Sequence, residues 1–437
     1  MNDINFVYIL NKNDPNVNIV INPNNNNDIL MDKGEFESFI KFIDTRNYKE
    51  IDDKLFQKIL SQNLLNNYKI KHELNEERNV VYMVLTNLCN YNCIYCYAKM
   101  HNDFQTDNKT LSYLEGVTII DNIIKAKYKN IIFTGGEPML CECVFDLASY
   151  AKRKGLVVGL LTNAKLVNKE NIMKLNRFHY VQISLDSHVP DINDKTRGKG
   201  HLTKTLEALQ LLSNHNISIF INSVVTKYNY DSLIDTMKFL RERYNIIEHV
   251  YSFYSPYNKI NLPDLYLTLE EKIKTIKDYY VYLINNKTNA VNLWQNNNSV
   301  STICAMGASE ICINPYGEVY PCRLLCTKET KMGNALDDDL TLIIDQFYRE
   351  DFLKKFCVDN ISDCKKCSYK YLCGGGCRPS HIAYSEDVNI SYKDYCKVWE
   401  CNYIISKLLK HSIFDWDEKK YLLTNKLNYS QSKQNYI

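Results

Sequence analysis

The chain has 437 residues and a formal net charge of +2, which allows two or three domains with a substantial core. The near-neutral charge and the lack of a long basic run argue against nucleic acid or an anionic membrane as a partner. We find no apolar stretch near the ~18 residues of a membrane span, and no secretory signal at the N-terminus. Sixteen cysteines in such a chain favour metal ligation over disulfides, so we expect a cytoplasmic protein.

Residues 1–80 are predicted to form a small α+β domain in the order β-β-α-α. The segments 6–10 and 17–21 are short and apolar, and the turn-prone Asn-Asp-Pro-Asn between them indicates two strands. Apolar residues at helical spacing predict two helices, over 33–43 and 52–65. One interpretation of this domain is a packing appendage on the rest of the chain.

From residue 81 to about 290, strand-like and helix-like stretches alternate, which indicates βαβ units with a parallel sheet. The predicted strands are 81–86, 130–134, 156–161, 180–185, 217–225 and 246–253. The predicted helices are 110–127, 143–154, 168–176, 203–214, 230–243 and 268–285. Six units predict an α/β fold, a partial (β/α)6 TIM barrel that is open on one side. Its chemistry is expected at the C-terminal ends of the strands.

Three cysteines, Cys89, Cys93 and Cys96, follow the first predicted strand of this barrel. Three thiolates so close in sequence can hold three irons of a 4Fe–4S cluster, whereas four cysteines usually close such a cluster. The motif therefore predicts a cluster with one iron kept open for another molecule. A zinc site that lacks a ligand, or a set of buried thiols, is the alternative.

Glycine and polar residues stand at the ends of the next three predicted strands: Gly135, Gly136, Glu137, Asn163, Ser184 and Asp186. The two glycines allow close backbone approach, and Glu137 can accept a hydrogen bond from an ammonium group. Asn163 offers a polar group suited to ribose hydroxyls. Ser184 and Asp186 alternate along the fourth strand and share one face.

Cysteines return after a polar, Asn-rich bridge: Cys304, Cys322, Cys364, Cys367, Cys373, Cys377 and Cys396. The first two have the spacing Cys-x12-Gly-x4-Cys, and the turn around Gly317 predicts a hairpin between them. The next four have the spacing Cys-x2-Cys-x5-Cys-x3-Cys. A zinc ribbon is the structural alternative for these four.

These patterns resemble those of one enzyme family. The spacing Cys-x3-Cys-x2-Cys with Tyr95 before the last cysteine, followed by Gly-Gly-Glu-Pro, resembles the radical S-adenosylmethionine (SAM) enzymes. The seven later cysteines resemble the SPASM extension of that family in residue type and spacing. The resemblance implies a radical SAM barrel over 81–290, a cysteine-rich SPASM domain over 291–410 and a tail over 411–437.

The resemblance also implies the cofactors, which are SAM and three 4Fe–4S clusters, and their ligands. Cys89, Cys93 and Cys96 would hold the catalytic cluster, whose open iron chelates SAM. The residues implied at SAM are Tyr95, Gly135, Gly136, Glu137, Asn163, Ser184, Asp186 and Arg197. The first auxiliary cluster would take Cys304, Cys322 and Cys377, and the second would take Cys364, Cys367, Cys373 and Cys396.

The first auxiliary cluster then lacks a fourth ligand. Cys312 lies in the hairpin strand that pairs with the strand leading to Cys322, and such strands are ~4.8 Å apart. We therefore expect Cys312 to complete this cluster, with Cys326 as the alternative. A closed cluster can only pass electrons, whereas an open one could bind a substrate cysteine.

Enzymes with this extension mostly modify peptides or proteins. The resemblance therefore implies maturation of a ribosomally made peptide by a thioether or carbon–carbon cross-link. An external one-electron reductant such as flavodoxin or ferredoxin is the expected partner, and residues 1–80 would recognise a leader peptide.

Two competing functions remain. One is an anaerobic sulfatase maturase that forms formylglycine. Those enzymes carry an aspartate as base where this chain has Arg323, which cannot accept a proton at working pH. The other is a non-catalytic iron–sulfur electron carrier, which would have no use for Glu137 or Asp186.

Overall fold

The computed structural model describes residues 6–10, 18–66, 78–100, 108–255, 262–286, 300–302, 304, 306–307, 309–347, 356–385, 387 and 390–411. The predicted C-terminal tail lies outside these residues except for its first position. No helix in these ranges is both long and apolar enough to cross a membrane.

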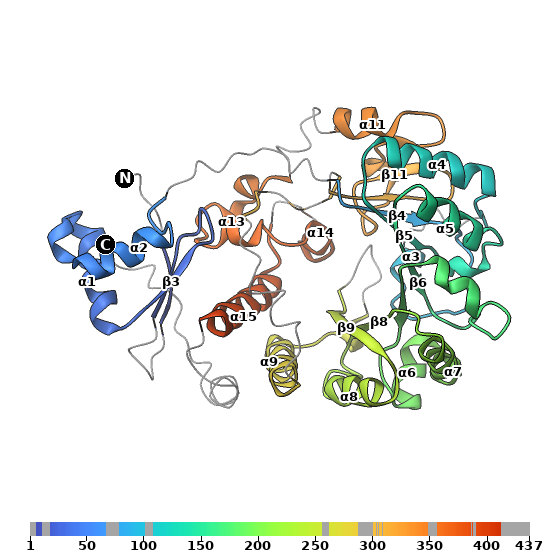
Figure 1. Cartoon of the computed structure of the whole chain (residues 1–437), viewed down its shortest axis with the longest axis horizontal. Coiled ribbons are helices and arrows are strands. Elements are labelled where there is room, and N and C mark those ends of the chain that lie inside the picture. The colour runs from blue at the N-terminus through green and yellow to red at the C-terminus, as the bar shows by residue number, and fades with distance from the viewer. Residues whose placement is uncertain are drawn as a thin grey trace.

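An open sheet of nine strands forms the centre of the molecule, in the order β12-β11-β10-β4-β5-β6-β7-β8-β9 (Figure 1). The six parallel strands of the predicted barrel are β4 (Val80–Val84), β5 (Asn130–Thr134), β6 (Val157–Thr162), β7 (Tyr180–Ser184), β8 (Ile219–Val225) and β9 (Ile246–Phe253). Along β4, Val81 and Met83 are buried in the main core, while Tyr82 faces the other side of the sheet. The predicted α/β class and open barrel are confirmed.

Helices follow the strands and cover the outer face of the sheet (Figure 1). They are α4 (Tyr113–Lys125), α5 (Val144–Arg153), α6 (Pro190–Arg197), α7 (His201–Asn214), α8 (Leu233–Arg243) and α9 (Leu269–Asn285). Ser112 and Glu115 form a capping box that fixes the start of α4, and Thr268 and Glu271 do the same for α9. The helix predicted over 168–176 is instead a 3-10 helix, Ile172–Arg177. Two short helices, α3 (Tyr97–Met100) and α6, were not predicted.

The predicted C-terminal hairpin continues the barrel sheet. It consists of β10 (Glu310–Ile313) and β11 (Glu318–Tyr320), with the short β12 (Gly333–Asn334) beyond. Strand β10 pairs in parallel with β4, and Cys312 lies opposite Tyr82. The strand that leads to the first cysteine motif therefore has a strand of the later cysteine region as its neighbour.

The remaining C-terminal helices are α11 (Leu340–Phe347), α13 (Lys370–Cys373), α14 (Arg378–Ser385) and α15 (Lys393–Lys410). Helix α15 packs against α9, so the end of the described chain is tied to the last helix of the barrel.

The N-terminal unit differs from the predicted β-β-α-α order because it has a third strand. Its antiparallel sheet contains β1 (Val7–Leu10), β2 (Asn18–Ile21) and β3 (Asp28–Met31), followed by α1 (Lys33–Thr45) and α2 (Asp53–Ser61). The Asn-rich stretch is the turn that joins β2 to β3, closed by a hydrogen bond from Asn22 N to Asn27 O of 2.8 Å.

Strand β3 begins with Asp28, a polar residue that is buried because charged side chains at the distant C-terminal helix α15 pair with it. Asp28 accepts Lys407 Nζ at 2.6 Å and Lys410 Nζ at 2.8 Å, and it also pairs with His411. Burial opposes ionisation of Asp28, but its partners His411 and Lys407 outweigh burial and hold its pKa below the ordinary value. The partners lie almost four hundred residues away, so local sequence could not reveal this strand.

This unit packs on the C-terminal helices through one face of its sheet, while its own helices cover the other face (Figure 1). The contact joins Val7, Ile9, Ile19 and Ile21 of the sheet to Tyr369, Leu372, Tyr403, Ile404 and Leu408. The N-terminal unit is therefore attached to the region of the later cysteines.

Candidate active site

The loop between β4 and α3 carries Cys89, Cys93 and Cys96 at the C-terminal end of the parallel sheet. Burial raises the pKa of Cys93 to about 11, and the nearby Arg197 opposes this rise. Cys96 and Cys89 are close enough to Cys93 to raise its pKa further, so the three thiols lie together. Thiolates in such proximity repel one another unless a cation lies among them, so this cluster loop suits a metal cluster.

The glycines after β5 hold this cluster loop in place. Gly136 N donates to Thr86 O at 2.8 Å, and Glu137 N donates to Leu88 O at 2.7 Å. A Cβ on Gly136 would lie 2.1 Å from Leu88 O, and one on Gly135 would lie 2.5 Å from Thr86 O. The close approach predicted for these glycines is therefore made to the backbone just before Cys89.

Glu137 is buried, with 1% of its surface exposed, and connects the ends of β5 and β6. Its carboxylate accepts Thr162 Oγ1 at 2.8 Å, Asn163 N at 2.8 Å and Met139 N at 3.1 Å. Burial raises its pKa to about 7, and these hydrogen bonds oppose the rise. An ionised carboxylate has roughly four acceptor positions, so one remains for the ammonium of a cofactor.

Two asparagines lie beside the first cysteine of the loop. Asn163 Nδ2 donates to Asn90 Oδ1 at 2.7 Å and lies 4.0 Å from Cys89 Sγ. Asn90 Nδ2 is buried and has no hydrogen-bond partner within the described part of the protein. A buried donor is costly to leave unpaired, so this site fits a bound group with acceptor atoms.

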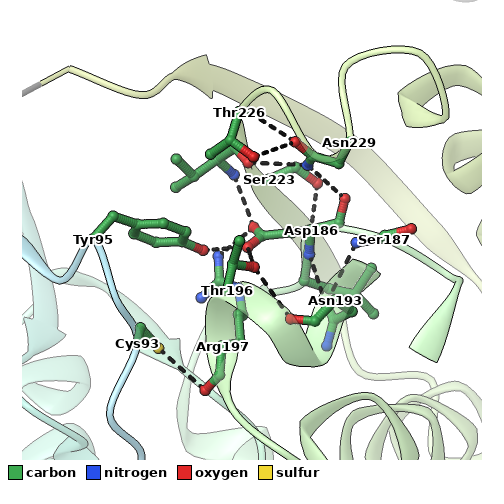
Figure 2. Close-up of polar contacts among 12 residues, drawn as sticks. Cys93, Tyr95, Asp186, Ser187, Asn193, Thr196, Arg197, Ser223, Thr226 and Asn229 are labelled. Carbon is green, nitrogen blue, oxygen red and sulfur yellow. Dashed lines mark hydrogen bonds and ion pairs between the residues drawn. The ribbon is translucent and has the colours of Figure 1, made fainter. Parts of the chain in front are cut away.

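Asp186 is the centre of a buried polar cluster that connects the loop to the far strands of the barrel (Figure 2). Its carboxylate accepts Tyr95 Oη, Thr196 Oγ1 at 2.8 Å, Arg197 Nη2 at 2.8 Å and Val224 N at 3.0 Å. Tyr95 comes from the cluster loop and Arg197 from the end of α6, so one carboxylate fixes three segments.

Arg197 is one of the residues implied at SAM, and the structure pairs its guanidinium with Asp186. Its Nε is buried without a hydrogen-bond partner among the described residues, so this donor is left for a ligand. Ser184 is half-buried at the end of β7, opposite Asn222 of β8. The predicted SAM residues thus surround the cluster loop from β5, β6, β7 and α6. They fit a bound cofactor through Glu137, Asn90 and Arg197.

A cavity of about 60 Å³ joins this site to the C-terminal hairpin. Its lining includes Tyr97, Gly135, Gly136, Cys312, Arg323 and Cys326. The guanidinium of Arg323 lies 4.8 Å from the ring centre of Tyr82 and 5.8 Å from that of Tyr97. Tyr82 and Tyr97 were not predicted as site residues, because only the pairing of β10 with β4 brings them to Arg323.

The later cysteines form two groups. Burial raises the pKa of Cys364 to about 11 and that of Cys373 to about 12, and Cys396 reinforces both. Cys367 is also close enough to raise the pKa of both thiols, so the four predicted ligands of the second auxiliary cluster lie together. Within the described ranges no three His, Cys, Asp or Glu side chains are placed to hold a single metal ion.

Cys304, Cys322 and Cys377 form the other group. Burial raises the pKa of Cys322, and Glu310, Cys304 and Cys377 reinforce the rise. Cys312, the expected fourth ligand, is buried with Cys326 and Tyr320 and packs against Tyr82.

The structure is a partial parallel β/α barrel with a three-thiol loop at the C-terminal ends of its strands and two further cysteine groups. These features define a barrel enzyme that binds iron–sulfur clusters. The model of the radical SAM superfamily matches residues 83–240, and that of the SPASM iron–sulfur cluster-binding domain matches residues 304–368. The chain belongs to the radical SAM superfamily and carries a SPASM domain. It therefore uses SAM and a 4Fe–4S cluster, and the SPASM domain binds further clusters.

Two curated relatives indicate the range of the family. Mycofactocin maturase MftC of Mycolicibacterium smegmatis is 27% identical over 67% of this chain and 76% of that protein. Fe-coproporphyrin III synthase of Methanosarcina barkeri is 33% identical, but the match spans only 35% of this chain and 39% of that protein.

Two solved structures share the fold. SuiB of Streptococcus suis bound to the precursor peptide SuiA aligns over 89% of this chain and 98% of that chain, with a TM-score of 0.60 and 18% identity. The structure of anSMEcpe with bound AdoMet aligns over 76% of this chain and 98% of that chain, with a TM-score of 0.63 and 18% identity.

Proposed function

We propose that this enzyme matures a ribosomally made peptide by installing a thioether or carbon–carbon cross-link. One hydrogen atom leaves to the 5′-deoxyadenosyl radical, a second hydrogen leaves as a proton, and the remaining electron passes to an auxiliary cluster. The observation that carries the proposal is the cavity shared by the SAM-binding glycines and the C-terminal hairpin. Arg323, the residue after Cys322, is in the wall of this cavity, so a substrate group that reaches the cavity would lie near both the cluster loop and the hairpin. The similarity to mycofactocin maturase MftC and the fold shared with peptide-bound SuiB support a peptide substrate.

When bound with a reduced cluster, SAM would supply a 5′-deoxyadenosyl radical for abstraction of a hydrogen atom from the substrate. The protein orients and protects this chemistry. Glu137 would bind the ammonium of SAM, and the ion pair of Asp186 with Arg197 keeps the cluster loop, through Tyr95, against the barrel. Three 4Fe–4S clusters are proposed, held by the three groups of cysteines described above, with an external flavodoxin or ferredoxin as the reductant.

The test is anaerobic reconstitution with SAM, a reductant and any short peptide found encoded beside this gene. Mass spectrometry should show loss of two hydrogen atoms from the peptide, and fragmentation should locate the joined residues. Formation of 5′-deoxyadenosine with no change in any candidate peptide would contradict the proposed substrate class. Absence of SAM cleavage would instead favour an electron carrier.

Formylglycine formation is the second candidate, because the fold of anSMEcpe is shared as well. The position after Cys322 argues against it. Arg323 occupies this position in the cavity, flanked by Tyr82 and Tyr97, and offers no proton acceptor. A Cys- or Ser-containing sulfatase peptide that gains an aldehyde would reverse this preference.

We also propose that the N-terminal unit recognises a leader peptide. Its sheet has two edges, β1 and β3, and an extended peptide can add to an exposed strand edge. Hydrogen exchange should show protection of β1–β3 when the precursor is added. Protection confined to the barrel would leave this unit as a packing appendage.

A further inference from the structure

A carboxylate lies among the thiols of the first auxiliary group. Glu310 is the first residue of β10, and its Oε1 lies 3.8 Å from Cys322 Sγ. Cys322 in turn packs in one cluster with Cys304, and Cys377 is near enough to act electrostatically on its thiol. Three thiols and one carboxylate therefore converge from separate segments of the chain.

Cys312 is on the same face of β10 as Glu310 but two residues further along the strand. That step places it in the wall of the cavity with Cys326, Gly135 and Gly136. The two thiols pack together with Tyr320, and Cys326 Sγ contacts Cys322 O at 3.5 Å. Glu310, in contrast, contacts the Cys322 sulfur itself.

We propose that Glu310 is the fourth protein ligand of the first auxiliary cluster, in place of a fourth cysteine. Ligands bind metal in their deprotonated forms, so Cys322 and Glu310 would be two anions at close range in a partly buried site. Iron between them satisfies both charges, and carboxylate oxygen is an established iron ligand in proteins. The inference rests on the proposed assignment of Cys304, Cys322 and Cys377 to this cluster.

An oxygen ligand gives this cluster properties that four thiolates would not. Ligand identity sets the reduction potential of an iron–sulfur cluster, and replacing thiolate by a less donating ligand raises it. A single carboxylate is also easier to displace than a thiolate. A substrate thiolate could therefore take its place on the iron by simple ligand exchange, with no change in oxidation state.

The test uses the full chain with the three cysteines of the catalytic loop replaced by Ala, so that only auxiliary clusters remain. This parent is reconstituted with ⁵⁷Fe and should bind about eight irons. Mössbauer spectra should show one iron with a non-sulfur ligand. In Glu310→Cys this signal should merge with those of the sulfur-ligated irons, and the midpoint potential should become more negative. In Glu310→Gln the EPR spectrum should change, and added β-mercaptoethanol should shift it further.

Glu318→Gln, in the paired strand of the same hairpin, and Cys312→Ser are the matched controls and should leave both spectra unchanged. An altered spectrum in Cys312→Ser with none in Glu310→Gln would overturn the inference in favour of Cys312. Identical spectra in the parent and Glu310→Gln would also overturn it. A parent with only about four irons would show that the cluster assignment itself fails. No measurement requires SAM or a peptide, so failure of the proposed function would not affect the result.

Discussion

Replacing Gly136 by Ala tests whether the glycine pair positions the cluster loop. The added Cβ would lie 2.1 Å from Leu88 O and 2.9 Å from Asn87 O, whereas real Cβ contacts stay beyond 3.0 Å. The obstacle is backbone and cannot rotate away, so the loop has to move by about 1 Å. Leu88 directly precedes Cys89, and a displacement of ~1 Å at a reacting centre can cost ~100-fold in rate.

We therefore expect Gly136→Ala to lower the rate of 5′-deoxyadenosine formation ~100-fold. The assay is anaerobic turnover of SAM, with iron content measured on the same samples. Gly155→Ala is the control, because Gly155 has a φ of +92° but no atom within 4 Å of an added Cβ. It should cost ~1–2 kcal/mol of stability through backbone strain and leave SAM cleavage intact. A wild-type rate in Gly136→Ala, or an equal loss in Gly155→Ala, would refute the reasoning.

Three further predictions follow from the same structure. The reconstituted enzyme should hold about twelve irons, and the variant with Ala at the three cysteines of the cluster loop should hold about four fewer. Zinc bound at the later cysteines would contradict this prediction. Because the pKa of Glu137 is raised from 4.5 to about 7, its charged form is disfavoured in the fold, so its contribution to stability declines as pH rises across that range. SAM affinity should increase through about pH 7, and Glu137→Gln should abolish that dependence in a binding titration. Asp28→Asn should leave Lys407 buried without its counter-charge, which costs ~3–5 kcal/mol and should speed hydrogen exchange in β3 and α15. Since the pKa of Asp28 is lowered in the fold, the ion pair of Asp28 with Lys407 should weaken as pH falls below ~4. Unchanged hydrogen exchange in either experiment would contradict the role of Asp28 in joining β3 to α15.

The sequence predicted the parallel strands and the cysteine motifs because both are local signals. Short apolar stretches rich in β-branched residues mark the strands, and the spacing of the cysteines can be read without knowledge of the fold. The 3-10 helix Ile172–Arg177 was predicted as a longer helix, because periodicity does not distinguish the two types at this length.

Long-range pairing accounts for what the sequence could not predict. Strand β3 depends on contacts between Asp28 and the C-terminal helix, and Arg197 is turned to Asp186 by the approach of α6 to β7. The neighbourhood of Cys312 depends on the register of β10 against β4, which places Cys326 and Tyr82 beside it. The cysteine motifs indicate which residues can ligate iron, whereas the register of β10 against β4 determines which of them lie next to one another.

The parallel pairing of β10 with β4 has a consequence for truncation and chimera design. A chain cut near residue 290 would lose the only strand that covers the outer side of β4 in the described sheet. The strand leading to the catalytic loop would then become an unprotected sheet edge, which is a template for aggregation. Exchange of C-terminal regions between relatives should therefore carry β10–β12 with the barrel and place the junction after Asn334.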